Sequence, residues 1–100
     1  MDDQTLEIVT FKTVSDASPD AVLVAGQGIL PWLHAQPGFL SRHLGQAEDG
    51  QWVDCVRWET KADAFAAADA IMSAPGAAAF MGVIEPGSVV MRHYHVTLAA

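Results

Sequence analysis

Alternation of polar and apolar residues marks four strand-like stretches in this chain. The clearest is Gln51–Thr60, Q-W-V-D-C-V-R-W-E-T, which is rich in Val and Trp. Three further stretches are predicted to be strands, namely Thr5–Val14, Phe39–Gln46 and Ser88–Leu98. In Thr5–Val14 the residues of both strand faces include apolar side chains, so we expect this strand to be covered on both faces.

A helical spacing of apolar residues follows the first strand. It runs from Asp20 to His34, with Ser18 placed as the N-cap and Pro19 at the first helical position. Pro31 is expected to kink this helix or to end it. Gly26 and Gly28, inside this predicted helix, indicate close packing of the helix on the sheet.

The pattern T-K-A-D at Thr60–Asp63 predicts a second helix that begins with a capping box. In that motif the side chain of Thr60 caps the helix and the side chain of Asp63 reaches back. The apolar stripe ends at about Ser73, and Ala77–Ile84 predicts a short extra helix. The resulting order is typical of an α+β, ferredoxin-like βαββαβ fold with a four-stranded antiparallel sheet in the order 4-1-3-2.

Composition limits the possible partners. We predict one domain over residues 1–100, because the length suits a single domain. The chain is 51% hydrophobic, which favours a partner surface and most simply a symmetric dimer, although alanine enrichment between residues 61 and 80 offers another explanation. A net charge of −7 without a basic cluster argues against nucleic acid and anionic membranes. The single cysteine, with no signal-like or long apolar stretch, predicts a soluble cytoplasmic protein.

Two short motifs carry a family resemblance. P-G-F-L at residues 37–40, and V-R-W-E-T at 56–60 followed by A-D-A-F at 62–65, resemble the dimeric α+β barrel superfamily, close to the antibiotic biosynthesis monooxygenase-like proteins. The resemblance implies a homodimer whose two sheets face each other, with a pocket between helices and sheet in each protomer. It further implies a cofactor-independent monooxygenase that acts on an aromatic or polyketide-like molecule. The alternative is a non-catalytic, ligand-binding or stress-responsive dimer.

The haem-degrading branch of that superfamily places a Trp and then a His in and after the second helix. In this sequence Phe65–Ala68 and Ala78–Met81 occupy those regions, and neither signature side chain is present. The resemblance therefore does not extend to haem degradation, and we expect no bound cofactor.

Histidines are the candidate acid–base groups, because their pKa lies near neutrality. We predict His43 and His93 as catalytic residues, with Asp54 or Glu59 as the orienting carboxylate. Solvated or interface histidines are the competing interpretation. The residues predicted to line the ligand pocket are Trp58, Tyr94, His95, Phe39 and Phe65.

A metal site is not expected. His93 and His95 share a strand face, but a third ligand is needed, and His43 of the same chain lies at the far edge of the predicted sheet. Only His43 of the partner subunit offers a third imidazole. Cys55, in the middle of a strand, is interpreted as a core residue and not as a nucleophile.

Two further features of the strands remain open. Arg57 and Arg92 are expected to pair with carboxylates such as Asp54, Glu59 or Glu7, because a half-buried guanidinium needs an acceptor. The remaining large side chains are expected in the core or in a flat apolar pocket, and they are Trp32, Trp52, Phe80, Met72 and Met81. The sequence also leaves open whether Trp58 faces the helices or a partner's sheet.

Overall fold

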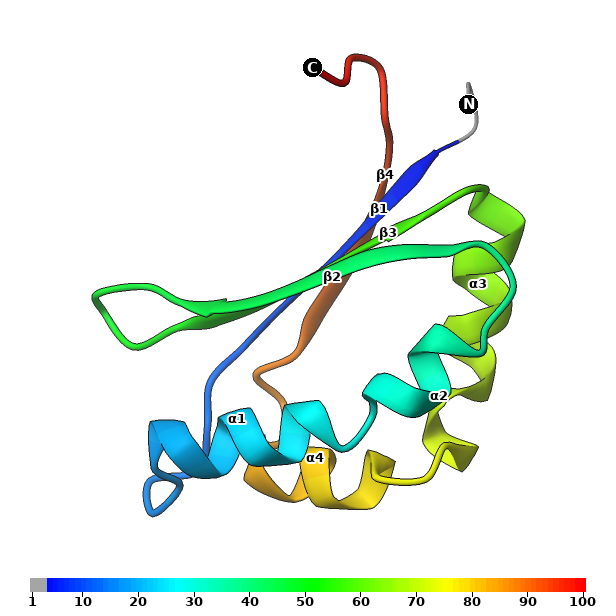
Figure 1. Cartoon of the computed structure of the whole chain (residues 1–100). Coiled ribbons are helices and arrows are strands. Elements are labelled where there is room, and N and C mark those ends of the chain that lie inside the picture. Colours follow the sequence, from blue (N-terminus) through cyan, green and yellow to red (C-terminus); the bar gives the residue numbers. More distant parts are fainter. Residues whose placement is uncertain (1–3) are drawn as a thin grey trace.

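The computed structural model describes residues 4–100, and its elements follow the predicted order. The strands are β1 (Thr5–Phe11), β2 (Phe39–Gln46), β3 (Trp52–Trp58) and β4 (Val90–His95). The helices are α1 (Pro19–Gln27), α2 (Leu30–His34), α3 (Lys61–Ala70), the 3-10 turn η1 (Ile71–Ser73) and α4 (Ala77–Val83). All of the helices lie on one side of the sheet, as Figure 1 shows.

The four strands form one antiparallel sheet in the order β2-β3-β1-β4. This order confirms the predicted α+β, ferredoxin-like arrangement. The first strand is shorter than predicted, because the chain leaves the sheet after Phe11. Thr13 then bridges Ile84, and the amide of Val14 donates to the carbonyl of Val83 at 3.0 Å. The end of α4 is thereby tied to the start of the first connection.

The helix starts agree with the sequence signals. The side chain of Ser18 accepts from the amide of Ala21, and that of Thr60 accepts from the amide of Asp63, at 3.1 and 3.0 Å. The predicted break at Pro31 is confirmed, since α1 ends before it and α2 is a separate helix with proline in its first turn. No return bond from the Asp63 side chain is found among residues 4–100, so only half of the predicted capping box forms.

At Gly26 the helix α1 packs closely against the sheet. A Cβ atom at this position would lie 2.9 Å from Leu44 Cδ2 and 3.6 Å from Phe80 Cε1. Gly28 has a different role, because it caps the end of α1 and its carbonyl lies against Gly76 in the turn before α4. Close packing on the sheet therefore explains the first of these glycines and not the second.

The sheet has a covered face, which points toward the helices, and an open face, which does not. Strand alternation assigns the buried residues of β1 and β3 to the covered face, among them Phe11, Trp52, Val56 and Trp58. The open face consists of Leu6, Ile8, Thr10, Ser41, His43, Gly45, Val53, Cys55, Arg57, Val90, Arg92 and Tyr94.

In the described chain no single helix is long and apolar enough to cross a bilayer. The pair Lys61–Ser73 and Ala77–Val83 reaches that length and composition only jointly, and it is bent by 86°.

Candidate functional site

A cavity of about 290 Å³, here called the inner cavity, lies between the covered face and the helices. Its walls are mostly apolar, with Val9, Phe11 and Val56 on the sheet side. The helices and the connections beside them contribute Ile29, Leu33, Ala68, Ile71, Met72, Ala77, Phe80, Met81, Ile84 and Val89. Three ionisable side chains also line it, and these are Glu7, Arg42 and Asp54. An apolar cavity with a few converging polar groups is the usual form of a small-molecule site.

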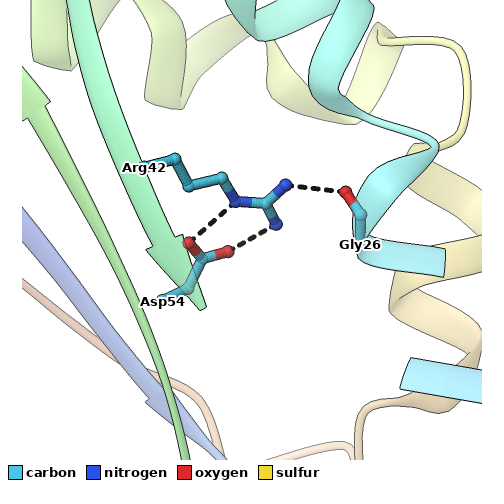
Figure 2. A network of polar contacts seen from close by, with 3 residues as sticks. All are labelled: Gly26, Arg42 and Asp54. Carbon is cyan, nitrogen blue, oxygen red and sulfur yellow. Dashed lines mark hydrogen bonds and ion pairs between the residues drawn. The ribbon is translucent and has the colours of Figure 1, made fainter. Parts of the chain in front are cut away.

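Arg42 and Asp54 form a closed ion pair in this cavity (Figure 2). Arg42 Nε donates to Asp54 Oδ1 at 2.9 Å, and Nη2 donates to Oδ2 at 2.7 Å. Nη1 donates to the carbonyl oxygen of Gly26 in α1 at 2.6 Å. The two side chains are only 6% and 11% exposed. The pair therefore fixes neighbouring strands β2 and β3 to each other and both of them to α1.

The guanidinium of Arg42 retains unused donors. An arginine has five N–H groups, and the bonds to Asp54 and Gly26 use three of them. The remaining two, one on each terminal nitrogen, have no partner among the described residues. The group also lies 5.6 Å from the centre of the Phe80 ring. Arg42 can thus donate to a ligand oxygen while its own position stays fixed.

Glu7 is the second charged group of the cavity wall. Its Oε2 lies 2.9 Å from Nε2 of His93, which faces it from the neighbouring strand β4. Burial raises the pKa of Glu7 above its ordinary value, the hydrogen bond from His93 opposes that rise, and the charge of Asp54 adds to it. Its other oxygen, Oε1, accepts no hydrogen bond from the described residues. Glu7 therefore has one bonded oxygen and one available to a ligand.

A second depression of about 320 Å³, here called the outer hollow, lies beside His93 and shares no lining residue with the inner cavity. It is lined by Thr5, Lys61, Phe65, His93, Tyr94 and His95. The rings of Phe65 and His93 pack edge-to-face, with their centres 4.6 Å apart. Lys61 Nζ lies 5.4 Å from the centre of the Phe65 ring. Four of the residues predicted from the sequence, Phe65, His93, Tyr94 and His95, therefore come together here.

The other predicted residues lie elsewhere. His43 is exposed on the open face of β2, at the far edge of the sheet from β4, so it does not meet His93. Trp58 is fully buried on the covered face and meets Phe39 edge-on at 5.8 Å, and neither residue is among those lining the two depressions. Trp58 Nε1 is a buried donor without a partner in residues 4–100. The catalytic role predicted for His43 stays a prediction.

The carboxylate partners predicted for Arg57 and Arg92 were wrong. Arg57 and Arg92 are exposed on the open face, whereas Asp54 and Glu7 lie on the covered face and bind Arg42 and His93. Among the described residues neither of these open-face arginines has an ion pair. The expected orienting carboxylate for His93 was likewise wrong, because Glu7 has that position.

Cys55 also differs from expectation. It is half-buried on the open face and not in the helix-covered core, and burial raises the pKa of its thiol. An unreactive thiol is still the result, since only the thiolate is a strong nucleophile.

Sequence reasoning missed the inner cavity's two polar anchors. Glu7 shares a strand face with Val9 and Phe11, and Arg42 shares one with Leu44. Each is therefore a charged residue beside apolar residues on the same strand face. A charge in such a position needs a buried partner, and that signal could have found both. No group of three or more potential metal ligands is found within residues 4–100.

Comparisons with known proteins extend the fold result. No protein-family model and no curated protein matches the sequence. Among solved structures, the cofactor-independent oxygenase SnoaB from Streptomyces nogalater is similar, at 14% identity, with 97% of this chain and 96% of that chain covered and a TM-score of 0.77. A candidate antibiotic biosynthesis monooxygenase from Nitrosomonas europaea is 15% identical, with 97% and 93% covered and a TM-score of 0.75.

A candidate monooxygenase from Shewanella loihica is 22% identical, with 99% of both chains covered and a TM-score of 0.71. At these identities the likeness shows the fold alone. The predicted resemblance to the antibiotic biosynthesis monooxygenase-like proteins is thereby confirmed at the level of the fold.

Proposed function

We propose that the protein is a cofactor-independent monooxygenase that oxidises a small fused-ring phenol or a polyketide-like aromatic in the inner cavity. The observation that carries this proposal is an apolar cavity with two charged side chains that keep a free hydrogen-bonding position, Glu7 and Arg42. A volume of about 290 Å³ lies just below the ~300–1,000 Å³ typical of ligand pockets, which favours a compact ligand. The similar structures named as oxygenases support the same reaction class.

The chemistry requires a base and a hydrogen-bond donor for the ligand oxygen. Removal of the phenol proton gives a phenolate, which passes one electron to O₂. The two radicals combine at a ring carbon, and the resulting peroxide anion takes up a proton to form a hydroperoxide. Loss of water then leaves a quinone, so that one oxygen atom ends in the product and the other in water. Glu7, whose pKa is raised by burial, suits the role of base. The free N–H groups of Arg42 suit the phenolate oxygen.

Oxygen consumption with a panel of fused-ring phenols and hydroquinones tests this function. Ala68 lines the inner cavity, and Ala66 is exposed on the same helix and does not. We expect Ala68→Leu to lower the rate at least tenfold by filling the cavity, and Ala66→Leu to retain it. Equal loss in both variants, or no oxygen uptake with any member of the panel, would contradict the proposal.

A ligand-binding role without catalysis is the second candidate, because each charged group of the cavity already has a protein partner, Arg42 with Asp54 and Glu7 with His93. It predicts that the same phenols bind, as measured by calorimetry, without oxygen consumption. The predicted absence of a cofactor and the cytoplasmic location stay predictions in either case.

We further propose that the open face is covered by a second copy of the chain. It presents Leu6, Ile8, Val53, Val90 and Tyr94 on a sheet that has helices on its other side only. Val90 and Tyr94 are 54% and 44% exposed, and exposed apolar residues gathered on one face of a sheet indicate an interface. A two-fold dimer is the simplest assembly that covers one face of each sheet.

A further inference from the structure

The pair formed by Glu7 and His93 is placed between the inner cavity and the outer hollow. Glu7 lines the first and His93 lines the second, and the two face each other across strands β1 and β4. Their side chains are 11% and 16% exposed, and their atoms approach to 2.9 Å. Their hydrogen bond joins the linings of the two depressions.

The charged groups around this pair leave it available for proton transfer. On the cavity side, Asp54 and Arg42 are bonded to each other and not to Glu7. On the outer side, His95 and Lys61 line the same hollow as His93, and neither forms an ion pair with it. The second ring nitrogen of His93 has no hydrogen-bond partner among the described residues.

We propose that Glu7 takes the hydroxyl proton of a ligand in the inner cavity and that His93 passes this proton to the outer hollow. The proposal rests on the proposed function, because a phenol in the cavity supplies the proton. The O–H bond of the ligand breaks and a new O–H bond forms at Glu7 Oε1. The neutral carboxyl group turns this O–H toward His93, and Nε2 accepts the proton when the imidazole carries its own proton on Nδ1. The imidazolium then releases the Nδ1 proton to water in the outer hollow, and exchange of the ring protons with that water resets the tautomer.

This route solves a problem that the cavity poses for catalysis. A buried carboxylate that accepts a proton from each substrate must lose it again before the next turnover, and the cavity walls around Glu7 are mostly apolar. An imidazole is suited to the exchange, since its pKa lies near neutrality and it has a nitrogen on each side. His93 acts through Glu7 and is therefore a relay, and Glu7 is the group that touches the ligand.

Rapid mixing with 1-naphthol under anaerobic conditions tests the relay, because this phenol is protonated at neutral pH and its near-ultraviolet absorbance reports its own deprotonation without any oxygen chemistry. We expect Glu7→Gln to abolish the fast deprotonation of bound naphthol and His93→Gly to slow it at least tenfold. Added imidazole should restore the rate of His93→Gly, and more basic imidazoles should restore it further. A residue with a structural role alone would show no such dependence on the added base.

Two variants guard against misfolding and unspecific effects. His93→Gln keeps an N–H donor toward Glu7 but cannot carry a proton, so it should be as slow as His93→Gly while it remains folded by circular dichroism. His34→Gln, at an exposed position of α2, should keep the normal rate. An unchanged rate in folded His93→Gln, or no rescue of His93→Gly by imidazole, would overturn the relay.

The outcomes for the relay and for the proposed function are distinguishable. Naphthol that is deprotonated through His93 without oxygen uptake by the phenol panel would support the relay and refute the monooxygenase. Naphthol that does not bind would overturn both, since the cavity would then not accept a phenol.

Discussion

On the covered face of the sheet the guanidinium of Arg42 is bonded to a carboxylate and to a helix carbonyl, whereas on the open face Arg57 and Arg92 are exposed and have no ion pair among the described residues. The same contrast holds for histidine, since His93 is bonded to Glu7 and His43 is exposed. Burial explains the difference, because a charge removed from water must find a partner and an exposed charge need not. The covered face therefore carries the fixed chemistry, and the open face is available to another protein surface.

The largest expected effect on stability comes from breaking the buried ion pair. Arg42→Met leaves Asp54 buried and unpaired, and we expect a loss of about 3–5 kcal/mol in the free energy of unfolding. Arg57→Met, on the adjacent strand but on the open face, should change it by no more than about 0.5 kcal/mol. Urea denaturation measures both. Equal losses would remove the distinction between the two faces.

Self-association should depend on the open face alone. Ile8→Glu places a charge in the centre of the expected interface, and we expect the dimer to dissociate at least tenfold more readily, which corresponds to about 1.4 kcal/mol. Leu23→Glu, on an exposed position of α1, is the matched control. Sedimentation velocity measures the assembly. A wild-type chain that sediments as a stable 10.6 kDa monomer would contradict the dimer.

The helices of the covered face depend on their caps. Thr60→Ala removes the acceptor for the amide of Asp63, and we expect a loss of about 1 kcal/mol in the free energy of unfolding. Thr97→Ala, in the exposed C-terminal segment, should have no measurable effect. A cost for Thr60→Ala no larger than that for Thr97→Ala would show that the cap does not hold α3.

The pH dependence of stability gives a finer test of Glu7. Its pKa is raised in the folded state, so the folded protein binds this proton more tightly than the unfolded chain does. The associated stabilisation is present below the ordinary pKa of glutamate and is lost as the pH rises through the raised value. Relative to Glu7→Gln, the wild type should therefore lose stability across that window in urea titrations at a series of pH values. Parallel curves for the two proteins would exclude this contribution.

Much of the fold could be predicted because its signals are local. Ser18, Thr60 and Pro31 set helix boundaries through interactions with residues close to them in the sequence. Strand alternation likewise assigns Trp58 and Cys55 to opposite faces of the sheet. Alternation alone could not say which face the helices cover, because both faces carry apolar residues. The structure answers that question by placing Trp58 against the helices.

The candidate site was only partly predictable. His93 and His95 share a strand, so their common location follows from strand alternation. The partners of Glu7 and Arg42 come from other strands, and their contacts depend on the register of β1 with β4 and of β2 with β3. The cavity itself depends on how far α3 and α4 lie from the sheet, which no local pattern encodes.

Locating a bound phenol is the most direct test of a ligand site on the covered face. A crystal of the protein with a brominated naphthol would reveal the ring position through the anomalous signal of the bromine. We predict a peak in the inner cavity beside Phe80, with the phenol oxygen within hydrogen-bond distance of Arg42 or Glu7. A peak only in the outer hollow or on the open face would contradict the assignment of the inner cavity as the functional site.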